Sequence, residues 1–209
     1  MKKLNFAKLV LGGLLCTVSS GCMEDENFLE LEQPRTLATR SSTQDGEPGY
    51  ITINYPTALS LKFNTAIYQD MELLWQLTKS SAYGGLRREL GFYIYYNYKT
   101  NKVYRGLTVY GPLVHNDETA NIDLGEPVNK DEVCASFHTH TPYTYMPAGS
   151  SRLTGRSLRD LLTATISGIP GIVYDYICDT LRAGHPIDYP AFVSTYGPER
   201  RSSRTISVN

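Results

Sequence analysis

Two of the chain's four histidines, His138 and His140, flank a single threonine at the end of an apolar run typical of a strand. Side chains two residues apart on a strand point to the same side, so both imidazoles can reach one point, as a bound metal ion requires. Asp160 follows at the start of a predicted helix. Its carboxylate would complete a set of two histidines and one aspartate, which leaves the fourth tetrahedral position of a zinc ion to water.

The same residues also have purely structural interpretations. A His-x-His pair occurs by chance and with both rings packed in a protein core. Ser157 and Asp160 are spaced as the N-cap and the first-turn acid of a helix, and helix capping alone accounts for both residue types. The residues themselves leave a metal site and these structural roles open.

Strands and helices alternate around these residues. The 16 tyrosines favour a protein rich in β-sheet, because tyrosine suits strands and half-buried surfaces. Apolar residues at three- and four-residue steps predict a helix before the tyrosine-rich segment. The expected elements are a strand at 51–53, a helix at 60–79, hairpin strands at 90–98 and 103–110, a strand at 132–137 that ends at the histidines, a helix at 157–167, and strands at 172–177 and 192–196.

Glu89, His138-Thr139-His140 and Ser157-Leu158-Arg159-Asp160 together resemble the signature of the JAB/MPN, or JAMM, zinc metalloproteases. The order of elements is similar too, with a helix, then a glutamate before a hairpin strand, a strand ending in His-x-His and a helix opened by Ser-x-x-Asp. The resemblance covers about residues 58–178 and is closest to small bacterial JAB-like domains. It implies an α/β (α+β) fold in which a mixed central β-sheet is flanked by helices.

The resemblance also implies a mechanism. Zinc would be held by His138, His140 and Asp160, and Glu89 would act as the general base and return the proton to the leaving amine. The Ser157 hydroxyl would donate a hydrogen bond to the developing oxyanion. The chain would then hydrolyse an amide or isopeptide bond in a peptide or protein.

Two alternatives to this mechanism remain open. Many relatives of this fold are thought to be catalytically silent, so the domain could be a binding or scaffold module. Glu89 directly follows Arg87 and Arg88, and a surface salt bridge would also explain it.

A segment of sixteen residues, 141 to 156, separates His140 from Ser157. This segment is longer than the family commonly has, and it begins and ends at the predicted site. It could close over a bound peptide as a lid, block the site, or be an inert insertion, since longer loops cost little closure entropy.

The first 21 residues predict an export signal. A basic start is followed by an apolar run, Leu9 to Val18, that is too short for a permanent membrane span. The small residues before Cys22 resemble the lipobox of bacterial lipoproteins, in which the cysteine is lipidated. Secretion with cleavage near Gly21 is the alternative.

A lipid on Cys22 would anchor the exported chain in the bacterial cell envelope. The acidic run Glu24-Asp25-Glu26 is similar to signals that send some lipoproteins to the exposed face of the outer membrane, although it would also suit a solvated tether. Composition predicts a flexible tether at 22–48, a single domain at 49–198 and a frayed polar tail at 199–209.

The remaining cysteines, Cys134 and Cys178, could form a disulfide in an exported protein or stay as two buried thiols. The net charge of −1 gives no basic excess, so nucleic acid is not an expected partner. The oligomeric state is left open.

Overall fold

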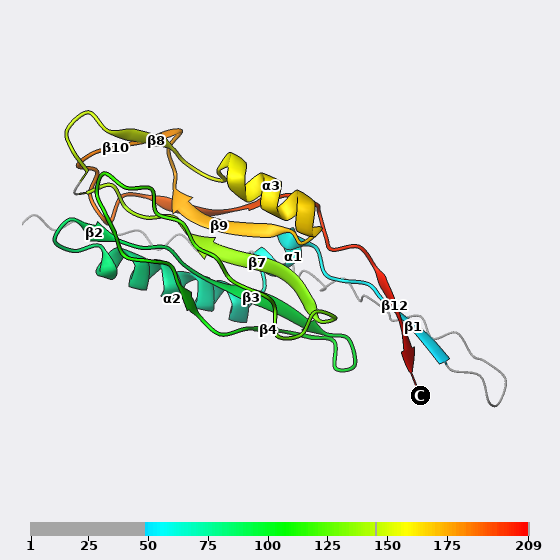
Figure 1. Cartoon of the computed structure of the whole chain (residues 1–209). Helices are drawn as coiled ribbons and strands as arrows, with labels where there is room; N and C mark the ends of the chain where they lie inside the picture. Colours follow the sequence, from blue (N-terminus) through cyan, green and yellow to red (C-terminus); the bar gives the residue numbers. More distant parts are fainter. Residues whose placement is uncertain (1–48, 145, 209) are drawn as a thin grey trace, which may run out of the picture. The chain divides into compact units, whose positions relative to one another are not determined.

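The computed structural model describes residues 49–144 and 146–208. Its centre is a mixed sheet of six strands, which confirms the predicted α+β class. Only the pairing of β7 with β9 is parallel, and the other pairs in this sheet are antiparallel. In order across the sheet the strands are β11 (Ala191–Tyr196), β9 (Gly171–Tyr176), β7 (Val133–Thr139), β3 (Leu90–Asn97) and β4 (Lys102–Arg105), with β5 (Val109–Tyr110) also pairing with β3 (Figure 1).

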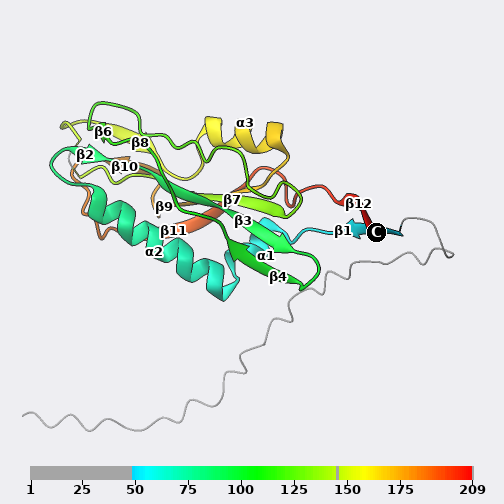
Figure 2. The same ribbon diagram turned by 60° about the horizontal axis from the view of Figure 1, so that its bottom comes forward.

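Helices lie on both faces of this sheet (Figures 1 and 2). On one face, α2 (Thr65–Ser81) packs against β3, β4 and β7, and on the other α3 (Leu158–Ser167) packs against β9 and β11. The indole of Trp75 on α2 stacks on the ring of Tyr174 in β9, with ring centroids 4.9 Å apart. The central strands are therefore covered on both sides, which explains why β9 is buried along its whole length.

The predicted helix at 60–79 is two helices in the structure, α1 (Ala58–Lys62) and α2. The break falls at Asn64, whose side chain accepts a hydrogen bond from the backbone N–H of Ile67 and so caps α2. Phe63, which a single helix over 60–79 would place on the same face as Ile67, is 67% exposed at this break. The apolar face that does pack on the sheet comprises Ile67, Met71, Leu74 and Trp75.

Two short antiparallel pairs flank the main sheet. One joins β2 (Leu86–Arg87) to β6 (Val114–His115), and the other joins β8 (Ser151–Leu153) to β10 (Thr180–Arg182). Strand β8 belongs to the long segment 141–156. Part of that segment is thus fixed against the strand that follows β9.

The prediction of a frayed tail at 199–209 is wrong for residues 204–208. These form β12 (Arg204–Val208), which pairs antiparallel with β1 (Gly49–Ile53). The two strands pair over their full lengths, and the hydroxyls of Thr52 and Thr205 lie 3.3 Å apart across the pair. The predicted signal, the tether and Cys22 lie outside the described residues. Within the described ranges, no helix is both long and apolar enough to cross a membrane.

Cys134 and Cys178 are free thiols, so the disulfide alternative is not realised. Cys134 lies near the start of β7, whereas Cys178 follows the end of β9. Because β7 and β9 run parallel, these positions are at opposite ends of the pair, too far apart for the ~4.4–6.8 Å Cα separation of a disulfide. The buried Cys134 thiol instead donates to the carbonyl of Ile94 at 3.3 Å.

Candidate metal centre

Successive side chains at the end of β7 point to opposite faces of the sheet. The Thr139 hydroxyl contacts the Thr78 hydroxyl of α2 at 2.6 Å and accepts a hydrogen bond from the Leu90 N–H at 3.1 Å. His138 and His140, one residue to either side, both face Asp160 of α3 on the opposite side of the sheet. The strand alternation predicted from the sequence therefore brings the two imidazoles together.

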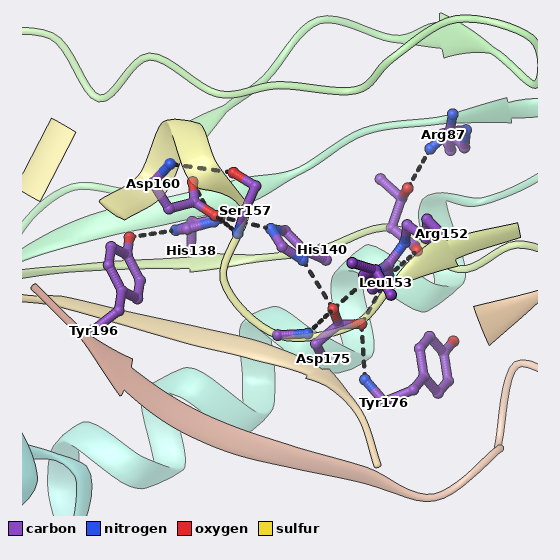
Figure 3. A network of polar contacts seen from close by, with 12 residues as sticks. Arg87, His138, His140, Arg152, Leu153, Ser157, Asp160, Asp175, Tyr176 and Tyr196 are labelled. Atoms are coloured by element: carbon purple, nitrogen blue, oxygen red, sulfur yellow. Dashed lines mark hydrogen bonds and ion pairs between the residues drawn. The ribbon is translucent and has the colours of Figure 1, made fainter. Parts of the chain in front are cut away.

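Asp160 lies between the two imidazoles (Figure 3). Its Oδ1 is 3.4 Å from Nε2 of His138, and its Oδ2 is 3.4 Å from Nε2 of His140. All three ligand atoms lie within 4.8 Å of one another. Ligands bonded at ~2.0–2.2 Å to one tetrahedral ion are themselves about 3.4 Å apart. These three residues therefore form a group that could bind a metal ion.

Helix capping occurs as well and does not compete with this arrangement. The backbone N–H of Asp160 donates to Ser157 Oγ at 3.1 Å, and the backbone N–H of Ser157 donates to Asp160 Oδ2 at 2.6 Å. This capping box fixes the Asp160 side chain at the first turn of α3, where it faces the histidines. The hydroxyl of Ser157 accepts one bond here and keeps its own proton for donation.

Asp175 on β9 is a site residue that we did not predict from the sequence. Its carboxylate is fully buried, and Oδ2 lies 2.9 Å from Nδ1 of His140. Arg152 donates to both oxygens of this carboxylate at 2.7 Å, and two backbone N–H groups, of Gly155 and Tyr176, donate to it at 2.8 Å. Figure 3 shows Asp175 between His140 and Arg152. Metal-bound histidines usually direct their second ring nitrogen to such a carboxylate.

His138 has its own support on the same face. Its Nδ1 lies 3.3 Å from the hydroxyl of Tyr196 on β11. Each histidine of the candidate site therefore has one ring nitrogen toward Asp160 and the other in contact with a side chain from another strand of the same sheet, β9 for His140 and β11 for His138. This orientation of both rings is what a pre-formed metal site needs.

The charges in the site stabilise one another. Burial acts to raise the pKa of Asp160, but the hydrogen bonds of His138 and His140 outweigh it and hold this pKa well below its usual range. Burial lowers the pKa of His140, yet the carboxylates of Asp160 and Asp175 raise it overall to about 9. For Asp175, Arg152 and His140 overcome the effect of burial and bring the pKa to about 2. Both aspartates are therefore ionised at neutral pH.

Glu89 lies in the same pocket as the two histidines, Asp160 and Ser157, and this pocket has a volume of about 860 Å³. The Glu89 side chain is buried, and it forms no ion pair with Arg87, Arg88 or any other described residue. The surface salt bridge considered for Glu89 is thus wrong. Burial raises the pKa of Glu89, and the nearby His140 and His138 only partly offset this rise.

The long segment 141–156 forms part of the pocket wall through Tyr143, Met146 and Arg152, among other residues. Backbone hydrogen bonds from Gly184 to Tyr143 and from Ala183 to Ser150 join it to the chain around β10. The pocket lies beside the described residues of this segment, 141–144 and 146–156, and these residues do not fill it.

Comparisons with family models, with curated proteins and with solved structures gave no match for this chain. The resemblance to the JAB/MPN metalloproteases therefore stays a hypothesis that depends on the motif residues and their order. The side chains themselves provide two imidazoles and a carboxylate for a metal ion, a second buried carboxylate, and a hydroxyl, all in one pocket.

Proposed function

We propose that this protein is a zinc-dependent metallopeptidase or isopeptidase of the JAB/JAMM type, which hydrolyses an amide bond in a peptide or protein. One observation carries the proposal: the buried carboxylate of Glu89 shares a pocket with the group formed by His138, His140 and Asp160. A metal site with an adjacent base that is not a ligand is the arrangement that metal-assisted hydrolysis needs.

The donor set favours zinc over other common ions. Two imidazole nitrogens and one carboxylate oxygen within 4.8 Å of one another suit Zn²⁺, whereas Mg²⁺ and Ca²⁺ prefer six or more oxygen ligands. Three protein ligands leave one position open, as in catalytic zinc sites. Zinc held there would act as a Lewis acid on the scissile carbonyl and would lower the pKa of water.

Two side chains, those of Glu89 and Ser157, perform the proton transfers and stabilise the oxyanion. Glu89 accepts a proton from the water that attacks the carbonyl carbon, and it then delivers this proton to the nitrogen of the departing amine. The raised pKa of Glu89 suits both proton transfers, because a carboxyl group whose pKa is closer to the working pH accepts and returns a proton more readily. The Ser157 hydroxyl donates a hydrogen bond to the oxyanion that forms on the carbonyl oxygen.

We further propose that the enzyme works outside the cytoplasm, anchored in the cell envelope through a lipid on Cys22. The support for this location is the basic and apolar start of the chain with small residues before the cysteine. Substrates would then be peptides or proteins of the envelope or its surroundings.

The test combines metal content with hydrolysis. The purified protein should hold about one zinc ion per chain by elemental analysis. It should cleave members of a panel of fluorogenic peptides and isopeptide-linked conjugates, lose this activity to a chelator, and regain it with zinc. A folded, zinc-loaded protein that cleaves none of the panel would favour the binding or scaffold alternative.

A further inference from the structure

The long segment 141–156 contributes a half-buried charge, Arg152, to the wall of the site. Arg152 on β8 donates through both terminal nitrogens to the two oxygens of Asp175, at 2.7 Å each. The same guanidinium also donates to the backbone carbonyls of Thr141 and Leu153 at 3.1 Å. Arg152 thus joins the start of its own segment, β8 and β9 through one side chain.

The contact of Arg152 with Asp175 continues to the candidate metal group. Asp175 has no exposed surface, and its Oδ2 is the atom that lies 2.9 Å from His140 Nδ1. The chain of contacts runs from Arg152 through Asp175 to His140 and ends at Asp160 (Figure 3). A two-point hydrogen bond from a planar guanidinium fixes the rotation of a carboxylate as well as its position.

A second contact supports the placement of the guanidinium. The ring of Tyr143, also in this segment, lies 5.5 Å from the guanidinium carbon of Arg152 and 5.4 Å from that of Arg87. Arg87 in turn donates to the hydroxyl of Thr141, the residue that directly follows His140. The segment is therefore held against the site in both of its described parts, at Thr141 and Tyr143 and again at Arg152.

We propose that Arg152 and Asp175 are positioning residues of the metal site, and that segment 141–156 is an integral part of this site rather than a lid or an inert insertion. Arg152 holds Asp175, and Asp175 holds His140 in the tautomer and orientation that direct Nε2 to the metal. The inference rests on the proposed zinc site, but it does not depend on any substrate.

A double-mutant cycle on zinc affinity tests this proposal. Zinc affinity is measured by competition with a chromogenic chelator for the full chain, for Asp175→Asn, for Arg152→Gln and for the double variant. Each single change should lower the affinity by about 10- to 100-fold, the usual effect of removing a partner of a ligating histidine. Because Arg152 acts through Asp175, its substitution should have little further effect in the Asp175→Asn chain.

Arg156→Gln is the matched control. Arg156 belongs to the same segment and lines the same pocket, but it is exposed, so the affinity for zinc should stay unchanged. Absorption spectra of the cobalt-substituted proteins provide a second measurement, because a misdirected His140 changes the ligand field while a merely less stable fold does not. Arg152→Lys keeps the charge and loses the two-point contact. Its zinc affinity should therefore lie between that of the original chain and that of Arg152→Gln.

Unchanged zinc affinity in a folded Arg152→Gln protein would overturn the proposal, as would losses that simply add in the double variant. If the Arg152→Gln protein does not fold, the Arg152→Lys protein provides the test. A zinc affinity and a cobalt spectrum equal to those of the original chain would then overturn the proposal. Failure of the protein to hydrolyse any amide would contradict the proposed function but would leave these affinities, and this inference, unaffected.

Discussion

The ring of Tyr196 lies directly over Gly171, with no room for a side chain between them. A Cβ at position 171 would stand 2.0 Å from Cζ of Tyr196 and 2.4 Å from its hydroxyl oxygen. The two residues are paired across β9 and β11, and the same hydroxyl contacts Nδ1 of His138. The absence of a side chain at position 171 therefore determines where the partner of a candidate metal ligand can lie.

Gly171→Ala should push the Tyr196 ring away from His138. We expect a loss of about 1–3 kcal/mol in the free energy of unfolding, as for other overpacked sites, and a zinc affinity about 10-fold lower. Chemical denaturation and chelator competition measure the two effects. Tyr196→Phe is the matched variant, since it keeps the ring and should reproduce the loss of affinity without the steric strain. Gly171→Ala with unchanged zinc affinity would show that the hydroxyl does not support His138.

Glu89→Gln should keep zinc and lose hydrolysis. The amide has nearly the same shape as the carboxylate but cannot accept a proton from water, and Glu89 is not one of the three candidate ligands. We expect kcat to fall by at least 100-fold on a substrate identified by the peptide panel. His138→Ala serves as the comparison, because it should lose both zinc and activity. Full activity of Glu89→Gln on a real substrate would assign the base to another residue.

Thr139→Val should destabilise the protein even though valine matches threonine in shape. The buried hydroxyl of Thr139 serves both Thr78 and the Leu90 N–H, and its removal leaves these groups without that partner. Unsatisfied buried groups cost about 1–3 kcal/mol, which urea denaturation can measure. Thr165→Val on the exposed surface of α3 is the control and should change stability by less than about 0.5 kcal/mol. A Thr139→Val effect as small as the control would contradict the role given to this hydroxyl.

Replacing residues 144–149 with a Gly-Ser linker of equal length should leave zinc affinity intact. This change spares Arg152 and the backbone contacts of Tyr143 and Ser150, and it removes Met146 from the pocket wall. We expect a change of several-fold in KM on peptide substrates with little change in kcat, because Met146 lines the pocket but is neither a candidate ligand nor the proposed base. Identical kinetics across the peptide panel would show that this part of the segment is inert.

Zinc should stabilise the folded chain by mass action. At a free zinc concentration about 100 times the dissociation constant, the free energy of unfolding should rise by about 2.7 kcal/mol, and a chelator should reverse this rise. Thermal unfolding with and without the chelator measures the difference. The His138→Ala protein should show no such difference, and a zinc-dependent shift of equal size in that variant would place the metal elsewhere.

The sequence was informative where the relevant interactions are local. Strand alternation correctly placed His138 and His140 on one face, and the spacing of Ser157 and Asp160 correctly predicted a helix start. Both patterns depend on backbone geometry over a few residues.

The features that the sequence did not reveal depend on contacts between distant residues. A charged residue inside the apolar run of β9 marks Asp175 as unusual, but nothing local connects it to Arg152, 23 residues earlier in the chain. Strand β12 was missed for the same reason, since its partner β1 lies at the other end of the described chain. The division between α1 and α2 was missed because Asn64 looks unexceptional until its side chain caps a helix.

Asp160 is shared between the first turn of α3 and the candidate metal group, and this sharing has a kinetic consequence. The helix buries Ala164 but leaves most of its surface exposed, so its own packing holds it weakly. Any opening of the first turn withdraws a carboxylate from both imidazoles at once. Helix fraying and ligand loss are therefore the same event: a bound ion would slow the exchange of the amide protons at the start of α3, and the opening rate of that turn would limit how fast the ion can leave.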